Sequence, residues 1–214
     1  MTGTDTGVGK TVLTAMLLAH LRDGGIDALA MKPFCSGSRG DARLLHSLEK
    51  ECLTLETVNP FYFDKPLAPA ADPKAAPIRK VLDKIRALAE MCEVLLVEGA
   101  GGLLAPLGKN YAAREIIAAL RCRTIIVARN RLGVINHTLL TANALQQATK
   151  EELTIVLMQG KNRDLSSKTN PQMLRQRLGG TRVFLIPHVD FLRANTREIK
   201  KSARFLKKTL AGIL

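Results

Sequence analysis

Short apolar runs alternate with longer helical patterns along this chain of 214 residues, and this alternation limits the fold more than any other feature. Each run is hydrophobic on both faces, which predicts a β-strand buried inside a parallel sheet. The predicted strands are Ala28–Lys32, Val94–Val97, Thr124–Ala128, Thr154–Met158 and Arg182–Ile186. Parallel strands joined through helices form right-handed crossovers, so we predict an α/β fold of three layers with helices on both faces of the sheet.

The helical patterns account for most of the remaining chain. They cover Lys10–Arg22, Asp41–Leu48, Ile78–Met91, Ala112–Leu120, Asn136–Gln147, Pro171–Leu178 and Thr196–Leu210. Residues 60–77 hold five of the nine prolines and indicate an irregular excursion. A chain of this length most economically forms a single domain, here residues 1–214. Because ligands bind beyond the carboxyl ends of parallel strands, we expect the loops at those ends to carry the chemistry.

The charge of the chain is concentrated at one end. The net charge is +13, and the basic C-terminal segment, residues 161–214, has 13 Lys or Arg against 3 Asp or Glu. Such a segment can attract nucleic acid or an anionic membrane, or it can be a solvated helix face. Aromatic residues make up 4% of the chain, which disfavours a stacking surface, so we do not expect nucleic-acid binding as the main function.

The cysteines indicate a reducing compartment. Cys35, Cys52, Cys92 and Cys122 are scattered without CxxC spacing, which predicts neither a zinc site nor a disulfide framework. No apolar run approaches the roughly 20 residues that span a bilayer, and no secretory leader is recognisable. We therefore expect a cytoplasmic protein without a membrane segment.

Residues Gly3–Thr11 predict a phosphate-binding loop of the P-loop NTPase type. A glycine-rich loop that leads into a helix presents backbone N–H groups to phosphates. The N–H groups expected here belong to Gly7, Val8 and Gly9. Lys10 would reach the β- and γ-phosphates of ATP, and the Thr11 hydroxyl would face Mg²⁺. The spacing is G-x5-G-K-T, one residue longer than the usual loop.

Further loops place charged side chains at the ends of predicted strands. Lys32 precedes a proline that holds it extended, so it either projects toward the ligand or reaches solvent. Asp41 is either the N-cap of the next helix or a carboxylate for a metal ion. Glu98 follows the run Val94–Val97 and precedes small residues, which favours a metal or water ligand beside a phosphate. Leu132–His137 opens a helix whose N-terminus can hold a carboxylate.

Together these motifs resemble the dethiobiotin synthase family, the ATP-dependent ring-closing enzymes of biotin synthesis. The matching pieces run in the family's order and are Gly3–Thr11, Lys32–Gly37, Asn59–Phe61, Glu98–Gly102, Pro106–Leu107, Leu132–His137 and Ile186–Pro187. A P-loop alone is unspecific. The longer loop combined with Lys-Pro-x-x-Ser-Gly, Val-Glu-Gly-Ala-Gly-Gly and Leu-Gly-x-Ile-Asn-His is highly specific.

The resemblance implies a ligase that carboxylates 7,8-diaminononanoate with CO2 and closes the ring to dethiobiotin. An amine captures CO2 as a carbamate, whose oxygen attacks the γ-phosphate of ATP. The second amine then closes the ureido ring from the carbamic–phosphoric anhydride. Bringing an anionic carbamate against an anionic phosphate requires positioned cations, and by resemblance these are Lys10 and Lys32.

The resemblance assigns further site residues. Those that match contacts to substrate or phosphate are Thr6 and Ser36. Those that match the magnesium ligands are Thr11, Asp41 and Glu98. Gln159 stands where the family often has an asparagine that reads adenine, and Pro187 is assigned to the nucleotide as well. Because Gln has one more methylene and more rotamer freedom than Asn, we expect ATP to be preferred over GTP by a modest factor only.

The resemblance also implies a homodimer in which the substrate carboxylate lies at a helix start of the second subunit. The residues of that helix start are Gly133, Val134, Ile135 and Asn136. One departure from the family is Gly7, which stands where some members carry an acidic residue and so removes any charge-based contribution there.

Two alternatives come from other classes of P-loop protein. A partition-type ATPase would bind DNA through a basic surface, but that family carries a signature lysine five residues before the Gly-Lys-Thr lysine. Asp5 occupies this position here. A relative that amidates a larger cofactor with glutamine would need a glutaminase domain, for which 214 residues leave no room.

The start of the chain carries one more expectation. Only Met1 and Thr2 precede Gly3, although the strand before such a loop needs about five residues. A missing strand leaves buried backbone groups unpaired at roughly 1–3 kcal/mol each. We hypothesise that the stated start is truncated, with about five to eight β-branched residues upstream. Without them the loop should be the least ordered functional element, with weak ATP binding.

Overall fold

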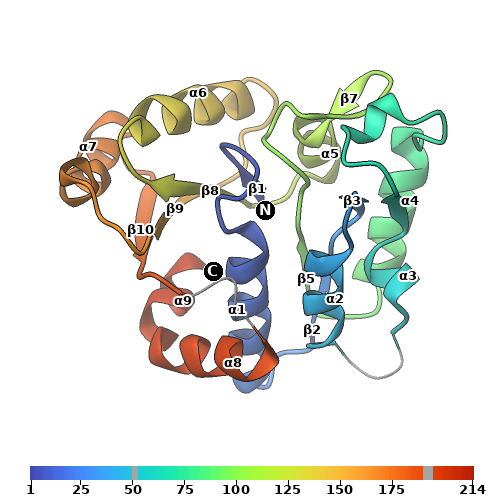
Figure 1. The fold of residues 1–214 in the computed structure, drawn as a ribbon, viewed down its shortest axis with the longest axis horizontal. Helices are drawn as coiled ribbons and strands as arrows, with labels where there is room; N and C mark the ends of the chain where they lie inside the picture. The colour runs from blue at the N-terminus through green and yellow to red at the C-terminus, as the bar shows by residue number, and fades with distance from the viewer. Residues whose placement is uncertain (50–52, 190–194) are drawn as a thin grey trace.

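A parallel sheet forms the centre of the molecule (Figure 1). The computed structural model describes residues 1–49, 53–189 and 195–214. Four strands pair in the order β1 (Thr2–Gly3), β8 (Thr124–Asn130), β9 (Leu153–Gln159) and β10 (Arg182–Ile186). A second parallel pair consists of β2 (Ala28–Met31) and β5 (Val94–Val97). All five predicted strands and the α/β fold are therefore confirmed.

Met1 joins the two groups of strands. Its α-ammonium donates to the Val97 carbonyl at 2.7 Å, and its own carbonyl accepts from the Gly99 N–H at 2.9 Å. On its other side, β1 pairs with β8 through the register Thr2 to Ile126. The order across the molecule is thus β2, β5, β1, β8, β9 and β10, with β1 only two residues long.

Helices cover both faces of the sheet, as the alternation of runs and helical patterns predicts (Figure 1). On one face lie α1 (Lys10–Asp23), α2 (Gly40–His46), α8 (Thr196–Phe205) and α9 (Lys207–Ile213). On the other face lie α4 (Ile78–Ala89), α5 (Ala113–Leu120), α6 (Val134–Gln146) and α7 (Asn170–Arg177). Successive residues of β2 alternate between these layers. Ala28 and Ala30 face α1, whereas Leu29 and Met31 belong to the core that α4 and α5 cover.

The predicted helix Thr196–Leu210 is instead two helices, α8 and α9, which meet at Leu206. The buried residues Ile199, Ala203, Leu206 and Leu210 keep the three-and-four spacing across the break, so both helices turn the same face inward. The opposite face of the pair is basic and exposed. Its residues are Arg197, Lys200, Lys201, Arg204, Lys207 and Lys208.

Several short elements were not predicted, because each has too few residues for a periodic pattern. β3 (Phe34–Ser36) pairs in parallel with β4 (Phe61–Phe63), and β6 (Pro106–Gly108) pairs with β7 (Tyr111–Ala112). The other short elements are α3 (Leu55–Val58) and the 3-10 turns η1 (Pro69–Ala71) and η2 (Leu165–Lys168). Among the residues described, no helix is both long and apolar enough to cross a bilayer.

Candidate active site

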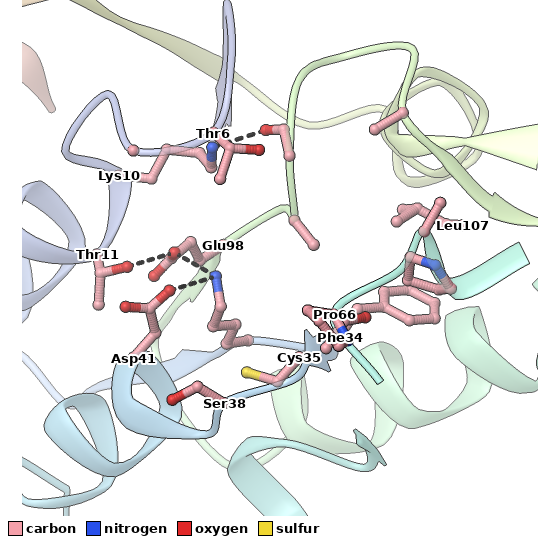
Figure 2. Close-up of a pocket in the computed structure, with 18 of the residues that line it drawn as sticks. Thr6, Lys10, Thr11, Phe34, Cys35, Ser38, Asp41, Pro66, Glu98 and Leu107 are labelled. Carbon is pink, nitrogen blue, oxygen red and sulfur yellow. Dashed lines mark hydrogen bonds and ion pairs between the residues drawn. The ribbon is translucent and has the colours of Figure 1, made fainter. Parts of the chain in front are cut away.

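A cavity of about 650 Å³ opens at the carboxyl ends of β2 and β5, beside the loop that precedes α1 (Figure 2). It brings together nine residues that sequence analysis assigned to the site. They are Thr6, Gly7, Gly9, Lys10, Thr11, Lys32, Ser36, Asp41 and Glu98. The segments that supply them lie far apart in the sequence and meet because their strands end at the same edge of the sheet.

The phosphate-binding loop owes its shape to two glycines. Gly7 and Gly9 have φ angles of 71° and 103°, a left-handed backbone that side chains disfavour. Val8 between them does not line the cavity, and its side chain packs into the core. The loop leads directly into α1, whose first residues Lys10, Thr11 and Val12 line the cavity. The first N–H groups of a helix have no acceptor within the helix and can bind an anion.

Lys10 reaches back across this loop. Its Nζ donates to the Asp5 carbonyl at 2.9 Å and to the Gly101 carbonyl at 2.6 Å. The pKa of Lys10 is lowered to about 8, mainly by burial and then by the nearby ammonium of Lys32, against the opposing effect of Glu98. The ammonium is therefore costly to keep charged here, and an anion placed beside it would raise its pKa.

Lys32 lies between two carboxylates, those of Asp41 and Glu98, which are labelled in Figure 2. Its Nζ is 2.6 Å from Glu98 Oε1 and 3.3 Å from Asp41 Oδ2, and the Thr11 hydroxyl donates to the same Glu98 oxygen at 2.7 Å. Burial alone would lower the pKa of Lys32, but the carboxylates of Glu98 and Asp41 outweigh it and raise the pKa above its ordinary value. Lys32 therefore remains a buried cation at neutral pH.

Asn59 holds the backbone of Lys32 in place. It is 1% exposed, and its Nδ2 donates to the Lys32 carbonyl at 2.8 Å. Its Oδ1 accepts from Arg39 Nε at 3.0 Å, which ties the loop before α2 to the same point. Sequence analysis included Asn59 in the resemblance without a role. The available signal was its place before Pro60, where an extended backbone is expected.

Two polar atoms in the cavity wall are buried without a partner among the described residues. They are Glu98 Oε2 and Ser36 Oγ. In the described part of the chain, no group of three or more His, Cys, Asp or Glu is arranged to hold a metal ion. The donors present are the carboxylates of Asp41 and Glu98 and the hydroxyl of Thr11. That set fits Mg²⁺, which usually takes one or two carboxylates and completes its shell with water and substrate phosphates.

The far side of the cavity is apolar. Phe34, Pro66, Leu67 and Leu107 line it, and Phe34 stacks on Phe61 with ring centroids 5.3 Å apart. Cys35 lies at the boundary between the charged and apolar walls. Burial raises the pKa of its thiol to about 11, so it stays protonated at neutral pH and is a poor nucleophile.

The remaining predicted residues lie outside this cavity. Gln159 ends β9 and is buried, and Pro187 follows β10 and is exposed. Gly133 is the N-cap of α6 and has a φ of 90°. Val134, the first residue of the helix, is buried, whereas Asn136 is exposed. Sequence analysis did not single out Asn130, which ends β8 next to Gln159, because it expected that strand to stop at Ala128.

A glycine-rich loop that leads from a buried parallel strand into a helix and ends in Gly-Lys-Thr defines the class of P-loop ATPases. The family model described as "AAA domain" matches residues 1–196. The ATP-dependent dethiobiotin synthetase of Anaeromyxobacter sp. (strain Fw109-5) is 38% identical over 99% of this chain and 96% of its own length. That of Bacillus subtilis (strain 168) is 39% identical over 84% and 82% respectively. The chain belongs to the dethiobiotin synthetase family.

A solved structure shares the fold. The ParA family ATPase from Chlorobium tepidum TLS superposes with a TM-score of 0.62 over 99% of this chain and 95% of that protein. The two sequences are 14% identical, so this similarity concerns the fold alone.

Proposed function

We propose that this chain converts 7,8-diaminononanoate, CO2 and ATP into dethiobiotin. The observation that carries the proposal is a single cavity with a charged end and an apolar end. Lys10 and Lys32 supply the cations of the charged end, and Phe34, Leu67 and Leu107 line the other. A substrate with two amines on an alkyl chain requires both ends, since its reacting groups turn anionic and its chain is apolar. The family to which the chain belongs supports the same reaction.

The reaction takes place at the charged end of the cavity. One amine uses its lone pair to attack CO2 and loses a proton, which gives a carbamate. A carbamate oxygen then attacks the γ-phosphorus of ATP, and the bond to the departing ADP oxygen breaks. The second amine attacks the carbonyl carbon of this anhydride and loses a proton. The bond to the phosphate oxygen breaks, and the five-membered ureido ring closes.

Lys10 and Lys32 have different tasks in this sequence. Lys10 lies in the phosphate-binding loop, so it would exchange the Asp5 and Gly101 carbonyls for phosphate oxygens. Lys32 comes from another strand and stays charged, so it would offset the repulsion between carbamate and phosphate. Thr6 and the unpartnered Ser36 hydroxyl would contact substrate or phosphate oxygens.

Mg²⁺ would be held by Thr11, Asp41 and Glu98, and when bound it would supply positive charge to the phosphates of ATP. The unpartnered Glu98 Oε2 supports this assignment. On the nucleotide side, Gly7, Val8 and Gly9 would offer backbone N–H groups to the phosphates. Gln159 and Pro187, at the ends of β9 and β10, would lie along the nucleoside.

A second copy of the chain would complete the site. The turn Gly133–Asn136 would receive the substrate carboxylate from the cavity of the other subunit, because a helix N-terminus attracts anions. Leu132 and Leu140 flank this turn and are 80% and 60% exposed, which supports a contact surface there. We place the homodimer in the cytoplasm, where the described cysteines, which form no disulfide, would stay reduced.

The test is to incubate the purified chain with diaminononanoate, bicarbonate, ATP and Mg²⁺ and to detect dethiobiotin by mass. The expected result is dethiobiotin and ADP in equal amounts, both dependent on the diamine. A parallel assay replaces the diamine with double-stranded DNA. ATP hydrolysis that DNA stimulates, without dethiobiotin formation, would overturn the proposal in favour of a DNA-dependent ATPase.

A further inference from the structure

The guanidinium of Arg39 makes several contacts with one segment of the chain. Arg39 is the N-cap of α2, two residues before Asp41. Its Nε donates to Asn59 Oδ1 and its Nη2 to the Asn59 carbonyl, both at 3.0 Å. Its Nη1 donates to Glu56 Oε1 at 3.2 Å, and its Cζ lies 5.2 Å from the centre of the Tyr62 ring. A single side chain therefore ties the start of α2 to the segment that contains α3 and β4.

Asn59 connects this contact to Lys32. Its Nδ2 donates to the Lys32 carbonyl at 2.8 Å and to the Pro33 carbonyl at 3.4 Å. The Arg39 guanidinium can only donate and the two carbonyls can only accept, so these partners fix the orientation of the Asn59 amide. The Lys32 N–H donates to the Val58 carbonyl at 2.9 Å. Both backbone groups of Lys32 are thus bonded to the residues that Arg39 holds.

The two carboxylates beside Lys32 are held in different ways. Glu98 follows β5, its side chain is 0% exposed, and its N–H donates to the Met31 carbonyl at 2.7 Å, so the sheet positions it. Asp41 lies in the first turn of α2, and its side chain is 56% exposed. Solvent screens a pair with so exposed a partner, so the ion pair itself holds α2 only weakly. The separation of 3.3 Å between Lys32 Nζ and Asp41 Oδ2 therefore depends on what fixes the start of α2.

The buried side chains of α2 hold the body of the helix, whereas the Arg39 side chain holds its start. We infer that Arg39 is a positioning residue that, through Asn59, keeps Asp41 beside Lys32. This inference rests on the proposed function, which uses both charged residues in the cavity. Neither Arg39 nor Asn59 lines that cavity, so each would act on the reaction only through residues that do.

The shape of the guanidinium matters more here than its charge. Two of its nitrogens meet two different oxygens of Asn59, which fixes a direction as well as a distance. Its charge is paired with Glu56 on the side away from Lys32. A lysine would keep the charge, but its single nitrogen cannot reproduce the two contacts with Asn59 and the one with Glu56.

The decisive experiment is a double-mutant cycle. Arg39→Met keeps much of the side-chain length and removes the hydrogen bonds. Dethiobiotin formation should slow about tenfold, at the low end of the effects of removing a residue that supports a metal ligand. In the Asp41→Asn background the same change should slow it less than about twofold, because the residue that Arg39 positions is already altered. Arg43→Met, one turn further along α2 and exposed, is the matched control and should change neither background.

A second measurement follows the metal ion without turnover. Mn²⁺ serves as the probe in place of Mg²⁺, and its dissociation constant is measured by electron paramagnetic resonance on the protein saturated with a non-hydrolysable ATP analogue. Arg39→Met should raise this constant about tenfold, again only while Asp41 is present. The affinity for the analogue without metal should change less than about twofold, because Arg39 does not line the cavity. A role limited to folding would not separate the two affinities.

Three results would overturn the inference. They are equal factors in both backgrounds of the cycle, unchanged turnover and Mn²⁺ affinity in a folded Arg39→Met protein, and a metal-free affinity that falls as much as turnover. Should Arg39→Met fail to fold, Arg39→Lys decides. Turnover should then fall about threefold, and only while Asp41 is present, whereas full turnover would contradict the inference. If the unaltered chain forms no dethiobiotin, the proposed function is refuted, and the Mn²⁺ constants still decide this inference.

Discussion

The strands on the two sides of β1 provide different chemistry. The side built on β2 and β5 ends in charged groups, with Lys32, Asp41 and Glu98 in contact. The side built on β8 and β9 ends in neutral amides, with Asn130 and Gln159 hydrogen-bonded to each other. Charges suit the transfer of a phosphoryl group, whereas amides suit the reading of a base. The phosphate-binding loop emerges from β1, between the two.

The two sides also differ in how well their strands pair. β8 and β9 pair over seven residues, whereas β2 and β5 pair over four. Within the described part of the chain, β1 and Met1 connect the two groups of strands, through two ladder positions and the contacts of Met1 to Val97 and Gly99. All four residues of β5 are half-buried, although strands in the middle of such a sheet are usually buried. The junction that positions Lys10 is therefore the weakest part of the sheet.

Removing Lys32 should have the largest effect of the three changes. It should lower the rate of the reaction at the charged side of the sheet and leave nucleotide binding largely unchanged. In Lys32→Ala, loss of a cation beside the reacting groups raises the barrier by about 3 kcal/mol, so dethiobiotin formation slows by about a hundredfold or more. ATP affinity should change little, because Lys32 comes from a different loop than the phosphate cradle. Turnover and calorimetric ATP binding, measured on the same preparation, check both parts.

The variant also removes the counter-ion of Glu98, so its thermal midpoint should fall and must be measured before the kinetics. Lys84→Ala is the matched control, because Lys84 is exposed on α4 away from the cavity. Unchanged turnover in a folded Lys32→Ala protein would remove the role given to this residue.

The second test addresses the junction between the two sides. About five to eight β-branched residues added ahead of Met1 should extend β1 alongside β5 and β8. They would also replace the Met1 ammonium, whose pKa burial lowers, with an uncharged peptide group. Pairing two or more buried backbone groups, at roughly 1–3 kcal/mol each, should raise the thermal midpoint by at least about 5 °C and tighten ATP binding.

A Gly/Ser extension of equal length is the control for this experiment, because it adds chain without strand propensity or apolar side chains. Equal midpoints and equal ATP affinities for the apolar extension and the unextended chain would show that the fold does not need a longer strand at this position.

The sequence predicted best the elements that a repeated pattern marks and the residues that lie within one motif. Apolar runs located the long strands, and the loop and strand-end motifs located Lys10, Lys32 and Glu98, which the fold brings into one cavity. Contacts between segments that are distant in the sequence produce no such pattern in the sequence and were not predicted. Asn59 supports Lys32 from another loop, and Asn130 clamps Gln159 across two strands. A single polar residue at a strand end looks like the start of a turn, so its burial becomes evident only when the neighbouring strand is in place.

The last test uses the titration of Lys10, where the two sides meet. Burial lowers the pKa of this lysine to about 8, and bound phosphates would raise it again because they favour the charged form. Binding must then take up a proton whenever Lys10 is neutral in the free protein. At pH 7 the ammonium is mostly present and little proton uptake is expected, whereas at pH 9 it is mostly lost. ATP affinity should therefore fall about tenfold between pH 7 and pH 9.

Calorimetry in two buffers with different heats of ionisation separates this effect from others that depend on pH, because it counts the protons taken up on binding. The expected uptake is about half a proton per ATP near pH 8 and rises toward one at pH 9. Lys32, whose pKa is raised, stays charged over this range and should contribute nothing. An affinity that stays constant to pH 9 without proton uptake would mean that Lys10 remains charged in the free loop. The carbonyls of Asp5 and Gly101 would then compensate for its burial.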